Sequence, residues 1–422
     1  MAIFHNIFEI SRTRPVRDCR VSQTNDYITV MDFFTKVDIP AAGFEIDYTS
    51  RIAFFGSCFA DNISAQFAAR KFGVLANPFG TVYNPVSIAG QIRAIADGKV
   101  FGEKDVFQDA RGLQDVSGKQ DARGNQDARG PWYSWDAHGS LSGATREECI
   151  EKLNNAATRT REFLKQADVV LITLGTAFVY YLKDASATTG NGDAHGRAVA
   201  NCHRQDPALF ERRLITVEEA ARALENIVRD LTRIKRDWIA TPTARDDEAN
   251  ITVRDDDRKF HIVFTVSPLR HMGDGAHNNT LSKATLQLAV NEIVKRESGT
   301  AAPSANSGTL PVSYFPSYEI VMDELRDYRF YADDMVHLSK TAEEYIFERM
   351  AETYCSEKTR AEIVQVEKFM KGANHRIADL ESPATHAFTE KILAQAKSLE
   401  KSISGLDLSE EIAKFSKISG NP

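Results

Sequence analysis

A serine stands where a strand would pass directly into a helix, in the segment RIAFFGSCFADNI. The apolar run 52–55 predicts a buried strand, which Gly56 and Ser57 follow at once, and a helix is predicted from Phe59. Such a junction offers unpaired backbone N–H groups to an anion that develops in a reaction. Ser57 therefore has the position of a nucleophile, although a serine there is also a common helix cap.

Cys58, the next residue, is an alternative nucleophile. The residue after such a serine tends to point into the sheet, and a free cysteine is usually a small core residue. We therefore favour Ser57.

A serine hydroxyl needs a base that removes its proton, and the base needs an acceptor that orients it. The stretch DYRFYADDMVHLSK supplies both, because Asp334 and His337 lie three residues apart in a predicted loop before a helix. The carboxylate can then reach one imidazole nitrogen while the other faces Ser57. Asp-x-x-His is frequent by chance, so its weight comes from its place after the last predicted strand–helix crossover.

Other polar residues could line the same site. Trp135 and Asp136 in YSWDAHG could form a wall, and Asn201 and His203 flank Cys202 in a predicted loop. We expect no thiol chemistry from Cys202, since neighbouring loop residues seldom point at each other.

Arg270 and His271 follow the fourth predicted strand at its carboxyl end, in SPLRH. Arg270 could hold an anionic group of a substrate. A pairing of Arg270 with Asp274 is the structural alternative, and we favour it.

Composition excludes several classes of protein. Of 422 residues, 42% are hydrophobic and 26% charged, as in ordinary globular proteins, and the formal charge of -7 comes without a basic stripe for nucleic acid. The longest mostly apolar run, 169–182, is too short to cross a bilayer, and the N-terminus has no continuous apolar signal segment. Five widely spaced cysteines suggest free thiols. We expect a cytoplasmic protein without nucleic-acid or membrane partners.

Strand-like and helical segments alternate along the chain, which predicts an α/β fold with a mostly parallel five-stranded sheet covered on both faces. The predicted strands are 52–55, 74–76, 169–174, 261–266 and 314–321, and the predicted helices are 59–72, 86–96, 146–166, 217–234, 281–296, 341–354, 361–371 and 389–403. We expect a loose tail over 1–30, a catalytic domain over 31–356 and a helical extension over 357–422.

Four polar stretches interrupt this plan and predict inserted loops, at 108–130, 185–196, 241–258 and 297–309. The first contains the hexapeptide repeat QDARGL QDVSGK QDARGN QDARG. A left-handed β-helix would need an aliphatic residue at a fixed place in each hexad, and at the place of Leu113 the later hexads have none, so we expect a solvated surface loop.

Several motifs occur in one order: FFGSCFADNI, NPFGTVYNP, LGTAFVYY, VANCH, SPLRH with DGAHNNTLSKATL, and YEIVMDELRDYRFYADDMVH. In this the chain resembles the GSCFA family, named for residues 56–60, from about Met31 to the helix after His337. That family is related to the SGNH or GDSL hydrolases, mostly esterases and acyl-ester transferases. The resemblance implies a flavodoxin-like three-layer α/β/α sandwich, with Ser57 as nucleophile, His337 as base and Asp334 as its partner.

Acyl transfer also needs donors to the tetrahedral oxyanion. The N–H of Ser57 or its neighbour is one candidate and that of Gly80, otherwise an ordinary turn glycine, is a second. SGNH enzymes usually supply a third from an Asn in Gly-x-Asn-Asp, whereas this chain has Gly175 and Thr176 there. Thr176, Asn84 or Asn201 would have to replace it.

We thus expect an esterase acting on a small ester or an acylated carbohydrate, without cofactor or metal. An O-acyltransferase acting on a carbohydrate and an inactive binding module stay as alternatives. A metal enzyme is a further one, because His271, Asp274, His277, Asp334 and His337 are possible ligands. The spacing of the first three is untidy for a loop ligand set, and no C-x-x-C or H-E-x-x-H signature occurs.

Overall fold

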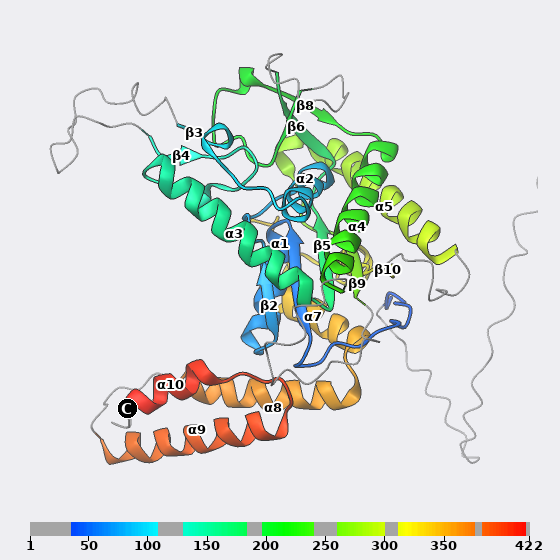
Figure 1. Ribbon diagram of the computed structural model, residues 1–422. Helices are drawn as coiled ribbons and strands as arrows, with labels where there is room; N and C mark the ends of the chain where they lie inside the picture. The colour runs from blue at the N-terminus through cyan, green and yellow to red at the C-terminus, as the bar shows by residue number, and fades with distance from the viewer. Residues whose placement is uncertain are drawn as a thin grey trace, which may run out of the picture. The chain divides into compact units, whose positions relative to one another are not determined.

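Five apolar segments pair as one sheet in the computed structural model of the chain (Figure 1). The strands are β1 (Arg51–Gly56), β2 (Gly73–Ala76), β5 (Val169–Leu174), β9 (His261–Val266) and β10 (Val312–Tyr314). Their order is β10-β9-β5-β1-β2, and every neighbouring pair is parallel. In chain order this is the 2-1-3-4-5 arrangement of flavodoxin-like sheets, so the predicted fold class is confirmed.

The structure describes residues 35–108, 130–183, 196–239, 260–299, 311–375 and 382–418. The predicted tail 1–30 lies outside the described residues, as do almost all residues of the four predicted insertions. Within the described part of the chain, no helix has the length and apolar character that a membrane span requires.

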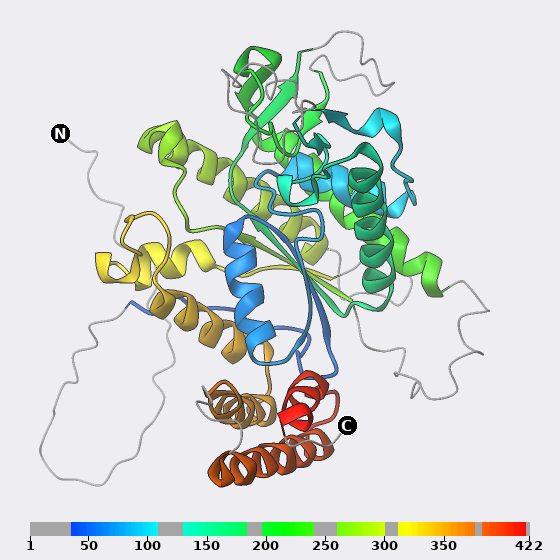
Figure 2. The same cartoon turned by 90° about the vertical axis from the view of Figure 1, so that its left-hand side faces the viewer.

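Helices cover both faces of the sheet (Figures 1 and 2). Alternate strand residues point to opposite faces, so Ala53 and Phe55 enter one apolar core and Ile52 and Phe54 enter the other. The first core is shared with α2 (Pro85–Ala96), α3 (Arg146–Gln166), α4 (Val217–Ile239) and α5 (Ala276–Gly299). The second is shared with α1 (Cys58–Ala69) and α7 (Lys340–Tyr354). The result is a three-layer sandwich.

Three further helices follow: α8 (Glu357–Ala373), α9 (Pro383–Ser402) and α10 (Ser409–Ile418). Ser356 and Ser382 cap the first two by accepting backbone N–H bonds from Thr359 and Thr385. Ile363 of α8 and Phe415 of α10 belong to the same apolar core as α7. These helices therefore share their core with the sheet domain.

Two small antiparallel sheets were not predicted. One has the order β7-β6-β8, from β6 (Phe178–Leu182), β7 (Ala198–Val199) and β8 (Phe210–Leu214), and the other pairs β3 (Phe107–Gln108) with β4 (Trp132–Tyr133). Three of these strands have only two residues, too few for a pattern of alternation. β8 has the sequence FERRL, whose adjacent charges hide its strand character.

The predicted strand 314–321 is wrong for most of its length. β10 ends at Tyr314, and a short helix, α6 (Ser317–Glu319), begins after Pro316 and continues as a π-helix, η7 (Ile320–Glu324). Proline has no N–H for a strand partner and its fixed φ suits a helix start, which explains the change. The remaining short helices are η1 (Glu103–Asp105), η3 (Gly139–Leu141), η4 (Pro207–Leu209), η6 (Met272–Asp274) and η8 (Tyr328–Phe330).

Candidate active site

Ser57 lies at the carboxyl end of β1, at the point where the strand order reverses between β1 and β5. Open α/β sheets bind ligands at such switch points. Ser57 is the N-cap residue of α1, yet its side chain makes no capping hydrogen bond, so the capping alternative is wrong. The hydroxyl is buried and has no hydrogen-bond partner among the described residues. A buried polar group without a partner is costly and calls for a functional explanation.

Gly56 allows this placement of Ser57. Its φ is +133°, and a Cβ there would lie 2.0 Å from the carbonyl oxygen of Thr173 on β5. Gly56 donates its N–H to Asn77 Oδ1 (2.8 Å), and Ser57 donates its own to Thr173 O (3.2 Å). Only glycine permits β1 and β5 to approach so closely here. The N–H of Ser57 is therefore already used within the sheet.

Asp61 anchors the loop after β2 to the first turn of α1. Its carboxylate accepts hydrogen bonds from Asn77 Nδ2 (2.7 Å) and Thr81 Oγ1 (2.9 Å). Sequence analysis missed this residue, although an acidic side chain in the first turn of a helix was visible as a signal.

Gly80 belongs to the loop that Asp61 holds. With φ +77°, it donates its N–H to Asn77 O (2.7 Å), and a Cβ would lie 2.3 Å from His138 Cβ. Gly80 is thus a turn glycine in close contact with His138, and its N–H is already used. In the first turn of α1, Ala60 donates its N–H to Ser57 O (2.7 Å), so the N–H groups of Cys58 and Phe59 are then the donors that the fold offers beside Ser57.

Gly175 is in contact with the candidate nucleophile. A Cβ on Gly175 would lie 3.2 Å from Ser57 Cβ and 3.2 Å from Tyr83 Cδ1. The N–H groups of Gly175 and Thr176 both donate to the carbonyl of Tyr83, at 2.7 and 2.9 Å. Tyr83 and Gly175 thus lie beside Ser57, and sequence analysis did not single out Tyr83.

The side chains proposed as third oxyanion donors have local partners. Thr176 Oγ1 lies 3.1 Å from Ser282 Oγ and accepts the N–H of Phe178 (3.1 Å). Asn84 Oδ1 caps α2 through Ser87 N (2.8 Å). Asn201 Oδ1 accepts the N–H of His203 (2.7 Å). Thr176 follows Gly175 directly and Asn84 follows Tyr83, so these two candidates are the ones that the contacts connect to Gly175.

Trp135, Asp136 and His203 form a separate cluster with β3 and β4. Trp135 stacks on Phe107 with ring centroids 3.7 Å apart, and Asp136 forms ion pairs with Lys99 and Arg197. The buried His203 stacks on Tyr133 and its Nε2 lies 2.7 Å from Ser134 O. In the described part of the chain, no hydrogen bond, ion pair or ring contact joins this cluster to Ser57 or His337. The structure gives these residues packing roles.

Asp334 and His337 are hydrogen bonded to each other. His337 Nδ1 lies 2.6 Å from Asp334 Oδ2, and Asp334 Oδ1 accepts the N–H groups of Val336 and His337, both at 2.9 Å. The bond from the His337 side chain, supported by these two N–H bonds, lowers the pKa of Asp334 to about 2. Asp334 therefore stays ionised at neutral pH and can hold the imidazole in one orientation.

His337 is not hydrogen bonded to Ser57, since Ser57 Oγ has no partner among the described residues. A chain of neighbours nevertheless connects them. The Tyr83 ring beside Ser57 contacts the His271 ring edge to face, with ring centroids 5.3 Å apart. The pKa of His271 is lowered mainly by burial and by Lys283, and to a smaller extent by His337. His337 itself is half exposed, whereas Ser57 is buried. The two side chains are therefore not in hydrogen-bond contact in this structure.

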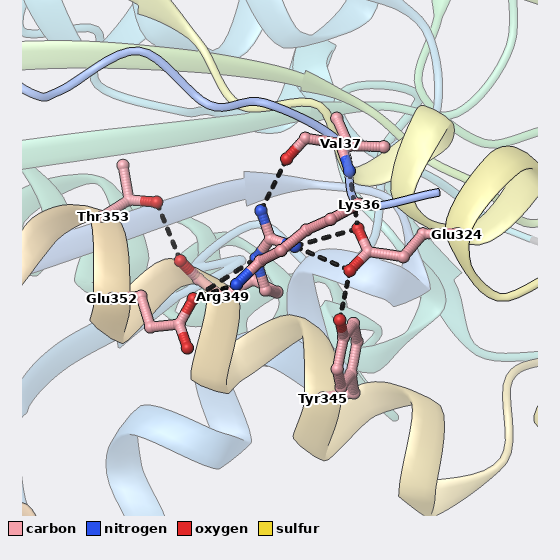
Figure 3. A network of polar contacts seen from close by, with 7 residues as sticks. All are labelled: Lys36, Val37, Glu324, Tyr345, Arg349, Glu352 and Thr353. Atoms are coloured by element: carbon pink, nitrogen blue, oxygen red, sulfur yellow. Dashed lines mark hydrogen bonds and ion pairs between the residues drawn. The ribbon is translucent and has the colours of Figure 1, made fainter. Parts of the chain in front are cut away.

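A buried ion pair closes the base of the His337 loop (Figure 3). Glu324 precedes the loop and Arg349 lies in α7 after it, and both Glu324 oxygens accept from Arg349 Nη1, at 2.7 and 2.9 Å. Tyr345 donates its hydroxyl to Glu324. Glu324 accepts the N–H of Val37, and Arg349 donates to the Val37 carbonyl (2.7 Å). The same ion pair therefore also holds the segment around Val37, which precedes β1 in the chain.

Arg270 does not pair with Asp274, so the favoured structural alternative is wrong. Asp274 is bonded to Arg212 of β8, which the sequence could not indicate because the two residues are far apart along the chain. Arg270 donates to Met322 Sδ (3.4 Å), and no carboxylate of the described residues lies within ion-pair distance of it. His271 donates its backbone N–H to Asn279 Oδ1 (3.0 Å).

Lys283 is a residue that sequence analysis missed. Its side chain is fully buried beneath the site, and its Nζ donates to Gly175 O (2.6 Å) and Ser267 O (2.7 Å). No local pattern in helix 281–296 marks this lysine as buried, because its partners are backbone carbonyls that follow β5 and β9.

Neither thiol nor metal chemistry finds support in the geometry. Burial raises the pKa of the Cys58 thiol and raises that of Cys202 to about 11, so both favour the thiol over the nucleophilic thiolate. Within the described ranges, no group of three His, Cys, Asp or Glu side chains is placed to hold a metal ion, and this includes His271, Asp274 and His277.

Comparison with known proteins gives a family and no individual relative. The model of the GSCFA family matches residues 51–241 and 247–350, which is well over half of the chain. These ranges contain Ser57, Gly175, Lys283, Asp334 and His337. No curated protein and no solved structure matches. The chain belongs to the GSCFA family.

Proposed function

We propose that this protein is a serine-dependent ester hydrolase of the SGNH or GDSL type. The observation that carries the proposal is the buried, unpartnered hydroxyl of Ser57 at the switch point of a flavodoxin-like sheet. The ionised Asp334 bonded to His337 supports it, because a serine nucleophile needs a base of this kind. The relation to the SGNH or GDSL hydrolases is part of the proposal.

In the proposed reaction, Ser57 Oγ attacks the ester carbonyl while His337 Nε2 takes its proton. Asp334 holds the imidazole through Nδ1 and stabilises the imidazolium. The first-turn N–H groups of α1 stabilise the oxyanion, and His337 returns the proton to the leaving alcohol. Water then cleaves the acyl-enzyme by the reverse sequence. His337 and Ser57 must come into contact for the first step.

We propose a small ester or an acylated carbohydrate as substrate, a reaction that needs no cofactor, and a cytoplasmic location. The four described cysteines are free thiols, which is compatible with a reducing compartment. A sugar hydroxyl in place of water in the second step would make the enzyme an O-acyltransferase by the same machinery.

An inactive binding module is the second candidate. The observation that favours it is that Ser57 is buried and makes no hydrogen bond to His337. Under this alternative, the site would bind an ester without cleaving it.

Labelling with a fluorophosphonate, followed by a screen of short esters and acetylated sugars, tests the proposal. We expect a covalent adduct on Ser57 and measurable turnover. Ser57→Ala should abolish both while the fold is retained, and Cys58→Ala, the adjacent control, should keep both. A folded protein that neither labels at Ser57 nor hydrolyses any ester of the panel would contradict the proposal, and ester binding without turnover would favour the binding module.

A further inference from the structure

Two cations lie at the carboxyl edge of the sheet without a carboxylate partner. Lys283 is 1% exposed, and its Nζ is bonded only to the carbonyl groups of Gly175 and Ser267 among the described residues. Arg270, three residues after Ser267, is partly buried and has the sulfur of Met322 as its partner. Burial lowers the pKa of Lys283 to about 7; the nearby Cys58 opposes this change and the charge of Arg270 adds to it. Buried charges are normally paired, so this arrangement calls for an explanation.

None of the nearby carboxylates of the described residues forms an ion pair with Arg270 or Lys283. Those from the surrounding segments have other partners: Asp61 binds Asn77 and Thr81, Asp274 binds Arg212, Glu319 binds Tyr314, and Asp334 binds His337. Asp323, exposed in η7, forms no ion pair with Arg270 in the described structure. Arg270 therefore has no carboxylate partner among the described residues, and its guanidinium can accept an anionic ligand as its partner.

Lys283 contacts the backbone beside the candidate nucleophile, and Arg270 is near enough to Lys283 for its charge to act on that side chain. Lys283 donates a hydrogen bond to the carbonyl of Gly175, and a Cβ on Gly175 would lie 3.2 Å from Ser57 Cβ. Arg270 is followed by His271, whose ring contacts Tyr83 beside Gly175. Lys283 is too deeply buried to meet a ligand first, whereas the partly buried Arg270 can present its planar guanidinium to one. Such a fork is suited to carboxylate and phosphate oxygens.

We propose that Arg270, with Lys283 behind it, binds an anionic oxygen group of the substrate. The esters cleaved at Ser57 then carry a carboxylate or phosphate near the scissile bond, on either the acyl or the alcohol side. This inference rests on the proposed ester hydrolase function and narrows its substrate class to acidic esters.

Matched substrates that differ only in charge test the inference. One pair is 4-nitrophenyl hydrogen succinate and its methyl ester, with the charge on the acyl side. The other is 4-acetoxybenzoate and its methyl ester, with the charge on the alcohol side. For the wild type, kcat/KM should favour the acid over its methyl ester at least tenfold in one of the pairs.

Substitution of Arg270 should remove that preference. Arg270→Gln should bring the ratio of kcat/KM values close to one, and Arg270→Lys, which keeps the charge without the fork, should give an intermediate ratio. Arg159→Gln, which changes an exposed arginine on α3, should keep the wild-type ratio. If the glutamine variant does not fold, the lysine variant provides the comparison.

The outcomes separate the two proposals. Labelling of Ser57 with ratios near or below one in both pairs, or a preference unchanged in Arg270→Gln, would overturn the anion site and leave the ester hydrolase standing. A folded protein without labelling or turnover would overturn both. A preference for the acid that Arg270→Gln abolishes and Arg159→Gln retains would support the anion site.

Discussion

Asp334 Oδ2 lies 2.6 Å from Nδ1 of His337, and the other oxygen of the same carboxylate accepts two backbone N–H groups. Among the described residues, the donors bonded to this carboxylate come from residues 336 and 337, and the loop fixes the imidazole orientation before any substrate binds. This preorganisation makes the pair a base of defined tautomer, with the proton on Nδ1 and a lone pair on Nε2.

Asp334→Asn should abolish most of the turnover without unfolding the protein. Asn Oδ1 can still accept the two backbone N–H groups, which leaves the amide NH₂ facing His337 Nδ1. The imidazole would then carry its proton on Nε2 and could not accept one from Ser57. We expect kcat to fall by about 10³–10⁴-fold, measured in steady-state kinetics with the best ester of the screen. Activity within tenfold of the wild type would show that Asp334 does not set the tautomer.

Gly175→Ala should damage the site through steric contact. The new methyl group would lie 3.2 Å from Ser57 Cβ, Tyr83 Cδ1 and Tyr83 O, closer than side chains normally pack. We expect a loss of about 1–3 kcal/mol in the free energy of unfolding and slower fluorophosphonate labelling of Ser57.

Gly90→Ala is the matched control for that substitution. Gly90 lies in α2 with open space around the added Cβ, so the change should stabilise the protein by roughly 0.5–1 kcal/mol. Chemical denaturation of both variants measures the difference. Equal stabilities would contradict the close contact at Gly175.

Glu324→Gln should destabilise the fold more than a surface substitution of the same kind. The change leaves the 5% exposed Arg349 side chain with only the half-exposed Glu352 as an ion-pair partner (3.5 Å) among the described residues. Breaking a buried ion pair typically costs about 3–5 kcal/mol, and the remaining contact with Glu352 should place this variant at the lower end. Glu162→Gln breaks an exposed ion pair with Lys165 and should cost about 0–1 kcal/mol. The double variant Glu324→Leu with Arg349→Met should recover part of the loss. Urea unfolding of the four proteins tests this, and a cost below 1 kcal/mol for Glu324→Gln would refute the structural role.

Elements whose structure is set by their own local sequence could be predicted. β5 and β9 are buried on both faces, so their mostly apolar runs VVLITL and HIVFTV indicated strands with the observed bounds. The junction at Ser57 was visible because one strand, one glycine and one helix start lie together in the sequence. The helix after Pro316 was missed because residues 318–321, YEIV, resemble a strand in composition. The prediction did not take into account that Pro316 ends a strand and favours a helix start.

Residues whose roles depend on distant partners could not be predicted. Arg212 binds Asp274, from which it is separated by 62 positions in the sequence. No local pattern indicates that Asp274 pairs with Arg212 and not with Arg270. Lys283 was missed for a related reason, since its partners are backbone carbonyls at the ends of two other strands. A backbone acceptor leaves no trace in a sequence, so the burial of a charged group becomes visible only in three dimensions.

Lys283 should make stability depend on pH in a defined window. Burial lowers the pKa of Lys283 from 10.5 to about 7, and its two carbonyl acceptors oppose this by stabilising the ammonium. Between those pH values the unfolded chain binds more protons at this group than the folded chain, so the free energy of unfolding rises with pH from about 7 to 10.5. Below about pH 7 this group is protonated in both states and adds no pH dependence. The free energy of unfolding of the wild type, minus that of Lys283→Met, should therefore increase across pH 7, 8 and 9. Lys397→Met, which removes an exposed lysine of α9, should show a constant difference. A constant difference for Lys283→Met as well would mean that the buried lysine keeps its ordinary pKa, held fully protonated by the carbonyl groups of Gly175 and Ser267.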